Sequence, residues 1–572
     1  MNLKKSYKLS IIGLNRFYLV GICLLFISPI ACVGKHTKES KVVDIAKQPN
    51  ILFILTDDHA SKAISAYGGG LNETPNIDRL ANEGIRFDRC FVNNSICGPS
   101  RAAILTGKFS HINGLTDNGI KFDNTQVTFP KLLQQAGYST AVVGKWHLGS
   151  QPSGFDYWNV LPGQGDYYNP EFIEMGDTTV VKGYVTDVIT DISLKWLKKR
   201  DANKPFCLLY HHKAPHRNWM PAPRHLNLYD SINFPVPESL FDDYKNRGTA
   251  ARTQEMEIDR HMYPIWDFKL ATLAEMDAYI ASNRYKNKND NGLDSKSKNM
   301  LEANDKSADL AKFLRVYEKM TVEQRKAWHK AYDPKTKAYR EANLNEKERL
   351  EWKYQRYVKD YLRSVAAVDE NIGKMIKHLE ETGELDNTII VYTSDQGFYL
   401  GEHGWFDKRF MYEQSYGTPL IIRYPKKIKK ETVSKALAMN IDLSPTLLDL
   451  AGIEIPEDIQ GASLTPILEN NGTVNSNWRK ATYYHYYEYP SWHSVKRHYG
   501  IRTERYKLIH FYNDVDEWEL YDLENDSQEL DNIYHQPENK ALIDALKDQL
   551  KELQIEYKDL DPTEQKIKFF QK

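Results

Sequence analysis

Four short apolar runs constrain the fold of this chain more than any other feature of its sequence. They cover residues 50–56, 139–143, 206–210 and 388–393, and helical patterns separate them. A continuous apolar run of this length is typical of a strand that is buried on both faces, as in a parallel sheet. Because such strands alternate with helices here, we predict an α/β domain with a mostly parallel central sheet flanked by helices.

Other segments complete the expected secondary structure. Amphipathic patterns predict helices at residues 77–83, 129–135, 185–199 and 358–379. Toward the C-terminus the pattern predicts antiparallel strands at 482–489, 499–502 and 505–512, and a closing helix at 541–558. We therefore expect a small C-terminal α+β subdomain, made of an antiparallel sheet plus a helix.

The chain divides into four expected parts. Residues 1–32 are predicted to be a signal peptide, 33–48 a polar tether, 49–468 the main domain and 469–572 the C-terminal subdomain. Within the main domain, residues 241–351 are rich in Lys, Asn, Asp and Glu and break the strand–helix pattern. We interpret them as an insertion whose role the sequence leaves open.

The N-terminal segment has the composition of an export signal. Basic residues without any acidic one precede an apolar run at residues 17–31. The tetrapeptide Pro29-Ile30-Ala31-Cys32 resembles the cleavage site of bacterial lipoproteins. We expect an exported protein, located in the periplasm or anchored by a lipid at the bacterial cell envelope. A permanent anchor helix is the alternative.

Charge and cysteine content exclude some classes of protein. Lysine plus arginine number 76 against 77 acids, so no overall field favours nucleic acid, and an anionic ligand must be met by local charges. Outside the signal the cysteines are Cys90, Cys97 and Cys207, too few for a disulfide framework. A pairing of Cys90 with Cys97 stays open, whereas Cys207 is expected to be a buried, inert thiol.

Polar residues follow each of the four predicted strands. They are Asp57-Asp58-His59, Lys145-Trp146-His147, the segment from His211 to His216, and Asp395-Gln396. The carboxyl ends of the strands form the edge at which open α/β sheets bind ligands, so these side chains predict a site.

An all-oxygen set of ligands belongs to this cluster. Asp57, Asp58, Asp395 and the amide of Gln396 offer the oxygen atoms that calcium or magnesium prefers. Neighbouring buried carboxylates repel each other, and a divalent cation is the natural way to keep them ionised. The alternative is that Asp57 and Asp58 only cap the following helix.

A fifth segment carries a family signature. The residues Cys97-Gly98-Pro99-Ser100-Arg101, followed by Thr106-Gly107-Lys108, are similar to the C-x-P-S-R and T-G-K motifs of the type I sulfatases. The resemblance extends over nearly the whole chain after the tether. It implies an alkaline-phosphatase-like fold and an enzyme that hydrolyses sulfate esters. It also implies a partner, the formylglycine-generating (sulfatase-maturating) enzyme, which converts the cysteine of the motif into formylglycine (3-oxoalanine).

The resemblance implies a mechanism of covalent catalysis. The hydrated aldehyde has two hydroxyls on one carbon: one attacks sulfur, and the other then loses its proton and expels sulfate. Carried over by position, the calcium ligands are Asp57, Asp58, Asp395, Gln396 and modified Cys97. Many relatives have asparagine at the position of Gln396, whose longer side chain makes it the least typical ligand.

The same resemblance assigns catalytic roles. Arg101 steadies the hydrate, Lys145 bridges the hydrate and the sulfate, and His147 is the base that triggers release. His216 and Lys408 bind the sulfate near the leaving oxygen. We expect His216 to be the general acid, because a sugar alkoxide leaves poorly without a proton.

Two stretches suggest the substrate. Residues 162–170 and 396–405 resemble the corresponding segments of N-acetylglucosamine-6-sulfatases, which act on heparan sulfate and related glycosaminoglycans. A sulfated saccharide is therefore the expected substrate. Candidates for the sugar contacts at the mouth of the site are His403, His485, Arg497 and His498.

The sequence leaves several alternatives open. A sulfatase for another glycosaminoglycan or polysaccharide position fits the catalytic motifs equally well. A phosphatase or phosphodiesterase of the same fold would need two zinc ions and a serine or threonine nucleophile, which Cys97 argues against. A glycan-binding lipoprotein whose Cys97 never matures is the non-enzymatic alternative. Exo or endo action and the oligomeric state are not determined by the sequence.

Overall fold

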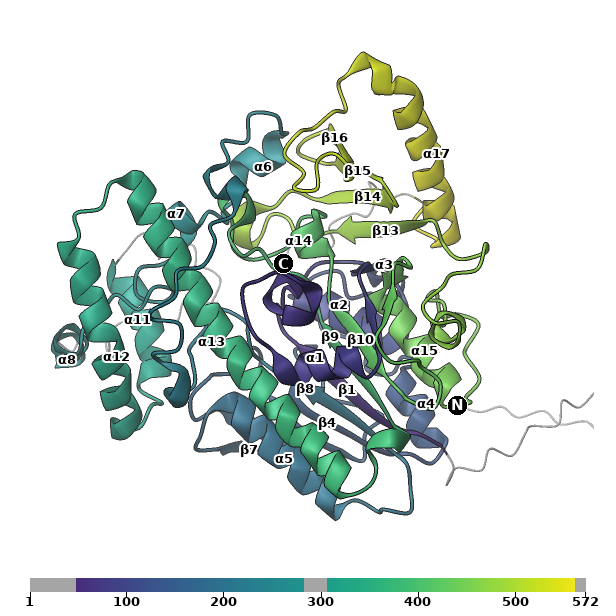
Figure 1. The fold of residues 1–572 in the computed structure, drawn as a ribbon, viewed down its shortest axis with the longest axis horizontal. Helices are drawn as coiled ribbons and strands as arrows, with labels where there is room; N and C mark the ends of the chain where they lie inside the picture. The colour runs from purple at the N-terminus through teal and green to yellow at the C-terminus, as the bar shows by residue number, and fades with distance from the viewer. Residues whose placement is uncertain (1–47, 282–305, 561–572) are drawn as a thin grey trace, which may run out of the picture. The chain divides into compact units, whose positions relative to one another are not determined.

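The computed structural model describes residues 48–281 and 306–560 (Figure 1). The predicted signal peptide lies outside the described residues, and so does the predicted tether except at its last position. No helix within the two described ranges combines the length and the apolar character needed to cross a membrane.

The central sheet has the four predicted strands at its middle. They are β1 (Asn50–Thr56), β4 (Ser139–Lys145), β8 (Phe206–His211) and β9 (Thr388–Ser394). All four run parallel in the order β9-β1-β8-β4, so β1 lies between β9 and β8. The predicted α/β fold with a mostly parallel sheet is confirmed.

Shorter strands extend this sheet on both sides to ten strands in the order β11-β2-β10-β9-β1-β8-β4-β5-β6-β7. They are β2 (Ile85–Phe87), β5 (Tyr157–Leu161), β6 (Glu171–Glu174), β7 (Asp177–Val180), β10 (Leu420–Arg423) and β11 (Thr432–Ser434). The strand β5 is parallel to β4, whereas β6, β7 and β10 pair antiparallel to their inner neighbours. β7 is exposed along its whole length, and the other added strands have only three to five residues, so the sequence pattern did not identify them.

One face of the sheet packs against three helices. Leu52 and Ile54 of β1 point to this face and join a core cluster with α1 (Pro75–Asn82), α5 (Val185–Lys199) and α13 (Glu346–Glu381). Figure 1 shows α13 passing along the sheet close to α5. Since successive side chains of a strand point to opposite faces, the alternate residues of β1 must be buried by other elements.

The opposite face is covered by a second set of helices. Phe53 and Leu55 of β1 pack there against α2 (Cys97–Thr106), α4 (Phe129–Gln135) and α15 (Leu443–Leu450). The helix α2 thus lies directly against the strand whose carboxyl end carries Asp57, and this brings the signature segment to the predicted site.

Residues 241–351 are largely helical where they are described. They contain α6 (Thr249–Thr253), α7 (Ile258–His261), α8 (Leu273–Ala281), α11 (Lys306–Tyr317), α12 (Val322–Glu341) and the start of α13. The helix α13 continues without interruption from Glu346 into the main domain. Short elements elsewhere are α3 (Ser110–Asn113), α14 (Glu413–Tyr416), α16 (Thr465–Glu469), β3 (Cys90–Phe91) and β12 (Ala438–Met439).

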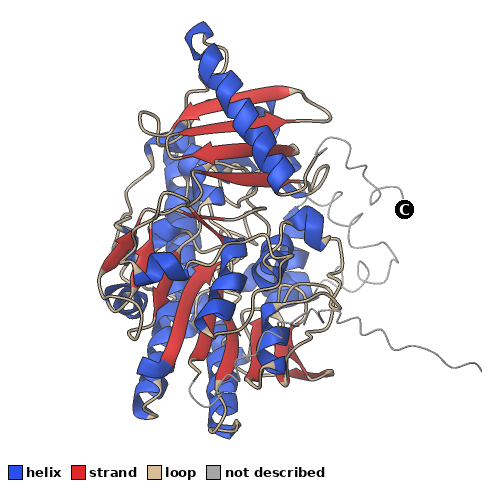
Figure 2. Cartoon of the chain, turned by 90° about the vertical axis from the view of Figure 1, so that its right-hand side faces the viewer, coloured by secondary structure: helices blue, strands red, loops and turns tan. Residues whose placement is uncertain are grey.

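The C-terminal part forms the predicted antiparallel sheet and helix. Its strands are β13 (Ala481–Tyr486), β14 (His498–Thr503), β15 (Tyr506–Phe511) and β16 (Glu517–Asp522), paired in that order, followed by α17 (Lys540–Glu556). Figure 2 shows α17 lying across this sheet. The last strand was not predicted.

This second sheet buries apolar residues of the main domain. Tyr484 and Phe511 from the sheet share a core cluster with Ile96, which directly precedes Cys97, and with Phe410, which follows Lys408 by two positions. The C-terminal sheet therefore supports two segments that carry predicted site residues.

We predict that a side chain at Gly144, the last but one residue of β4, would destabilise the protein. The φ of Gly144 is +108°, and a Cβ there would lie only 1.8 Å from the backbone oxygen of His211 on the neighbouring strand. We expect Gly144→Ala to lower the free energy of unfolding by about 3 kcal/mol, measured by chemical denaturation. The control is Gly68→Ala, where φ is +75° but no atom lies within 4 Å, so the cost should be about 1 kcal/mol. Equal effects of the two changes would contradict the steric explanation.

Candidate functional site

The carboxyl ends of β1 and β9 bring three carboxylates together. Thr56 pairs with Ser394 in the parallel register, so Asp57 and Asp395 leave the sheet side by side. Ligand oxygens of Asp57, Asp58 and Asp395 all lie within 4.8 Å of one another, and all three residues are buried. The backbone N–H of Asp58 also donates to Asp395 Oδ1 at 3.1 Å. The predicted cluster of carboxylates is thus present in the structure.

Cys97 is the first residue of α2 and points at this cluster. Its Sγ lies 3.4 Å from Asp57 Oδ1, and the residue is 1% exposed. Burial and the charge of Asp57 raise the pKa of the Cys97 thiol, so the unmodified thiol is a poor nucleophile here. Cys90, Cys97 and Cys207 are all buried free thiols, and the Cys90–Cys97 bridge that the sequence left open does not form.

Arg101 lies one helical turn after Cys97, on the same face of α2. Its Nε donates to Asp395 Oδ2 at 2.9 Å, and its Nη1 donates to the backbone oxygen of Lys145 at 2.8 Å. One guanidinium therefore ties together the ends of β4 and β9, next to residue 97.

Two lysines complete the charged cluster. Lys145 Nζ donates to Asp57 Oδ2, and Lys408 Nζ donates to both oxygens of Asp58 at 2.7 and 2.8 Å. Both lysines are buried, at 0% and 3% exposure. The sequence placed both at the site, and the structure brings both into it.

His216 lies against the same carboxylates. Its Nε2 is 3.7 Å from Asp58 Oδ2, and its Nδ1–H donates to the backbone oxygen of Arg217 at 2.7 Å. Burial keeps the pKa of His216 well below its usual range, although Asp57 opposes this effect. The neutral ring therefore presents an unprotonated Nε2 to the site, and a proton can leave from this nitrogen only after the ring has become an imidazolium.

His147 follows β4 with a φ of +56° and is half-buried. Burial and the neighbouring Lys145 lower the pKa of its imidazole well below the usual value. Within the described residues, its buried Nδ1 has no hydrogen-bond partner. A neutral histidine with a free ring nitrogen is suited to accept a proton.

The three carboxylates differ in their protonation equilibria. Burial raises the pKa of Asp58 to about 6 and that of Asp395 to about 7, in spite of the nearby cations. For Asp57 burial also acts upward, but Lys145, His216 and Arg101 together hold the pKa well below its usual range. Two of the three carboxylates thus need further positive charge to stay ionised at neutral pH.

The donor set fits a hard divalent cation. Three carboxylates converge, and among the described side chains the buried Gln396 Oε1 has no hydrogen-bond partner. The Nε2 atom of Gln396 faces Asp58 Oδ1 and lies 3.7 Å from Cys97 Sγ. Turning this amide by 180° would direct Oε1 to the centre of the cluster, where an oxygen ligand is needed. Asp57, Asp58, Asp395 and Gln396 can therefore hold such an ion.

The sequence interpretation missed several supporting residues. Tyr361 of α13 donates its hydroxyl to the backbone oxygen of Asp58 at 2.6 Å and accepts from the N–H of Ala60 at 2.8 Å. Gln164 Oε1 accepts from Lys145 Nζ, and Asn118 Oδ1 accepts from the N–H of Gly98 at 2.9 Å. Only Gln164 lay in a segment with a recognised resemblance. The other contacts join distant parts of the chain and leave no local signal.

The four predicted sugar contacts do not line an open cleft. His403 is 0% exposed, packs against Trp405 and accepts from Arg247 at 2.7 Å. The ring of His485 is held between Asp559 at 2.7 Å and Tyr512 at 2.6 Å.

The side chains of the other two candidates also make hydrogen bonds within the protein. His498 Nε2 accepts from the N–H of Met411 at 3.1 Å, and Arg497 Nε donates to the backbone oxygen of Tyr487 at 2.7 Å. Their expected place at the mouth was wrong, because Arg497 is buried against the segment after β13 and His498 is buried where the C-terminal sheet meets Met411.

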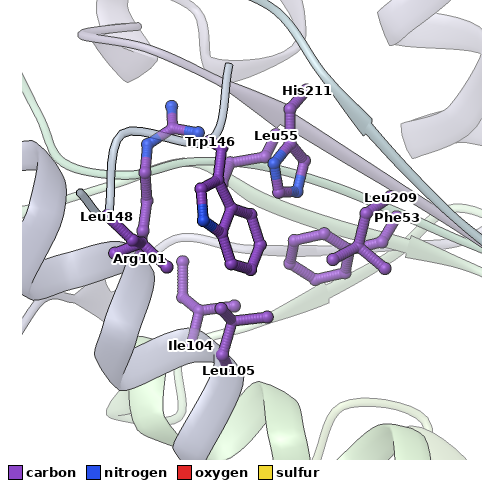
Figure 3. Close-up of a pocket in the computed structure, with 9 residues that line it drawn as sticks. All are labelled: Phe53, Leu55, Arg101, Ile104, Leu105, Trp146, Leu148, Leu209 and His211. Carbon is purple, nitrogen blue, oxygen red and sulfur yellow. The ribbon is translucent and has the colours of Figure 1, made fainter. Parts of the chain in front are cut away.

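The wall behind Arg101 is mostly apolar. A cavity of about 10 Å³, the size of one water molecule, lies there (Figure 3). It is lined by Phe53, Leu55, Arg101, Ile104, Leu105, Trp146, Leu148, Leu209 and His211. His211 Nδ1 lies 3.1 Å from the same Lys145 oxygen that Arg101 contacts. Apolar surroundings of this kind strengthen the electrostatic interactions of the site.

Comparisons with known proteins agree with this geometry. The Sulfatase family model matches residues 49–453, and the model for the C-terminal part of N-sulphoglucosamine sulphohydrolase matches residues 401–556. An N-acetylglucosamine-6-O-sulfatase of Bacteroides thetaiotaomicron is 53% identical over 545 residues, which cover 95% of this chain and 92% of that protein.

Two further matches are a human enzyme and a solved structure. The human N-acetylglucosamine-6-sulfatase is 27% identical over 461 residues, 76% of this chain and 66% of that protein. One solved structure contains a protein in complex with its substrate D-glucosamine-2-N,6-O-disulfate. It has a TM-score of 0.84 and 55% identity, and the match covers 91% of this chain and all of that one.

The raised pKa values predict how a divalent cation should affect stability. Without the cation, Asp58 and Asp395 keep protons that the unfolded chain loses at lower pH, so their contribution to stability falls between about pH 4 and 7. A bound cation keeps both ionised and removes this loss. Added calcium should therefore raise the thermal midpoint more at pH 8 than at pH 5.5.

Two variants control this measurement. Asp395→Asn should reduce the calcium-induced shift at pH 8 strongly, whereas Asp386→Asn, at a side chain that is 81% exposed, should leave it unchanged. A shift of equal size at both pH values, or one that survives in Asp395→Asn, would mean that the cation binds elsewhere.

Proposed function

This chain belongs to the sulfatase family, whose members hydrolyse sulfate esters, and we propose that it removes the 6-O-sulfate of N-acetylglucosamine or glucosamine in heparan sulfate or heparin fragments. The observation that carries this proposal is the position of Cys97. The residue of the signature motif points at three buried carboxylates from two adjacent strand ends. The substrate follows from the relatives with high identity over nearly their full length.

Two groups complete the site in this proposal. Asp57, Asp58, Asp395 and Gln396 would hold one calcium ion, which when bound would polarise the sulfate and help to ionise the attacking hydroxyl. A maturating enzyme would convert Cys97 to formylglycine, whose hydrate would supply one hydroxyl for attack on sulfur and a second one for release. The thiol itself would be a poor substitute, because burial raises its pKa.

The cationic side chains stabilise the transferred sulfate. Arg101 is fixed by Asp395 and by the oxygen of Lys145, so it can hold the hydrate of residue 97 in one orientation. Lys145 and Lys408 already contact the carboxylates, and they can turn to sulfate oxygens once a cation neutralises Asp57 and Asp58.

His147 and His216 each carry out one proton transfer in this proposal. His147, whose neutral ring has one unprotonated nitrogen, accepts the proton whose loss releases sulfate. His216 delivers a proton to the leaving sugar oxygen from Nε2. For this step the ring must first be charged, and the arrival of the anionic sulfate beside it favours the imidazolium.

We further propose an exported enzyme in the periplasm or anchored by a lipid at the cell envelope. The basic and apolar segment before Cys32 supports this location. An external position would give the enzyme access to extracellular sulfated saccharides.

A panel of defined substrates tests the proposed specificity. Release of inorganic sulfate should be faster from N-acetylglucosamine 6-sulfate than from its 3-sulfate by at least about 100-fold in kcat/KM. The 6-phosphate of the same sugar serves as the control for a phosphatase. Faster release from another sulfated position, or preferred release of phosphate, would overturn the assignment.

The nucleophile has its own test. Mass spectrometry of the peptide that contains Cys97, from protein made with a maturating enzyme, should show the aldehyde. Cys97→Ala should lower kcat by at least about 10⁴-fold and leave the thermal midpoint nearly unchanged, because the side chain is small. Retained turnover in this variant would exclude residue 97 as the nucleophile.

A further inference from the structure

The charges at the site pair one to one, with one cation left over. The ion pairs are Arg101–Asp395, Lys145–Asp57 and Lys408–Asp58. A fourth cation, Lys213, follows β8 by two residues and is 3% exposed. Its side-chain ammonium makes no hydrogen bond and no ion pair with any residue that the structure describes. The neighbouring buried Asp407 has its own partner in Arg409, so Lys213 is the cation of this group without a carboxylate partner.

Lys213 lies near the reacting groups rather than on a remote surface. Besides burial, the charges of Lys145 and Asp57 have the largest effects on the pKa of Lys213. Its Nζ lies 4.8 Å from the centre of the Tyr167 ring, and the Tyr167 hydroxyl donates to the backbone oxygen of His216 at 2.6 Å. Tyr167 thus holds the loop of His216 and faces the Lys213 ammonium.

An unpaired buried ammonium is costly to the folded protein. The ring of Tyr167 compensates for only a part of the lost hydration. In agreement, burial lowers the pKa of Lys213 to about 8, so the side chain is still mostly charged at neutral pH. An anionic ligand that binds to Lys213 would explain why this cation is buried without a carboxylate partner.

The reacting sulfate is the anion that best fits this place. A divalent cation at the carboxylates would add two more positive charges to a cluster that already has an excess of one. Only an anionic ligand can offset this excess. The sulfate must lie between residue 97, Lys145 and His216 for the reaction, and Lys213 precedes His216 by three residues on the same strand-end loop.

We propose that Lys213 is a substrate-binding residue that donates a hydrogen bond to an oxygen of the reacting sulfate. The proposal rests on the proposed sulfatase function, and it adds a contact to those predicted from the motifs. In the free enzyme the ammonium faces Tyr167, and it turns to the sulfate when the substrate binds.

The test compares variants of the mature enzyme in two assays. Binding of inorganic sulfate is measured by calorimetry, and kcat/KM is measured on N-acetylglucosamine 6-sulfate and on its N-sulfated analogue. Lys213→Met removes the charge at nearly constant volume, and Lys213→Arg retains it. Lys319→Met is the matched control, because Lys319 is a nearby lysine that pairs with Asp166 and Glu171 at the surface.

We expect Lys213→Met to weaken sulfate binding by about 10- to 100-fold and to lower kcat/KM on both substrates by a similar factor. Lys213→Arg should recover part of the loss, and Lys319→Met should behave like the wild type. The thermal midpoint of Lys213→Met should equal or exceed that of the wild type, because an uncompensated buried charge is removed.

Three results would overturn the proposal. Unchanged sulfate affinity in Lys213→Met would show that the ammonium does not receive sulfate. A loss confined to the N-sulfated substrate would place Lys213 at a second anionic group of the sugar. A clearly lower thermal midpoint would indicate a structural role. Because sulfate binding is measured without turnover, a failure of the proposed hydrolytic function is seen separately, as sulfate binding without ester cleavage.

Discussion

The repulsion between three buried carboxylates is the constraint on which the rest of this site depends. Asp57, Asp58 and Asp395 leave two adjacent strands at the same edge, with oxygens within 4.8 Å of one another. Their burial would protonate them unless positive charge is supplied. Each carboxylate has one cationic side chain as a partner, but Asp58 and Asp395 still have raised pKa values. A divalent cation would keep both ionised, and together with Lys213 it would favour the binding of an anion.

The strands that carry the carboxylates, β1 and β9, are buried along their whole length. The strand β1 lies inside the sheet, between β9 and β8, and helices cover both of its faces. The Tyr361 hydroxyl on α13 fixes the turn after β1 from one side. From the other side, α2 presents Cys97 and Arg101 on one helical face. The carboxylates, Cys97 and Arg101 therefore lie on one helix and on turns that directly follow buried strands.

The sequence was most informative where the structure is most regular. Continuous apolar runs identified the four inner strands, and the polar residues after them identified the carboxylates, Lys145, His147 and His216. Sequence order fixes these positions because every parallel strand delivers its carboxyl end to the same edge. Edge strands such as β7 were missed because their residues are exposed and have no apolar pattern.

The failures concern contacts between distant segments. His485 and His498 were expected at the mouth of the site, but His485 is buried between Asp559 and Tyr512, and His498 lies where the C-terminal sheet meets Met411. The sequence alone does not show whether a histidine side chain is exposed to solvent or buried against a tyrosine. Tyr361 and Lys213 were missed for the complementary reason: only the folded chain shows that one anchors the Asp58 turn and the other lacks a carboxylate.

The most direct test is a crystal structure of the mature enzyme grown with calcium, with an anomalous difference map to locate the ion. We expect one peak among Asp57, Asp58 and Asp395, about 2.3–2.6 Å from their oxygens, with the modified side chain of residue 97 as a further ligand. A map with no peak at these strand ends, or a peak that residue 97 does not reach, would contradict the shared site of the cation and the nucleophile.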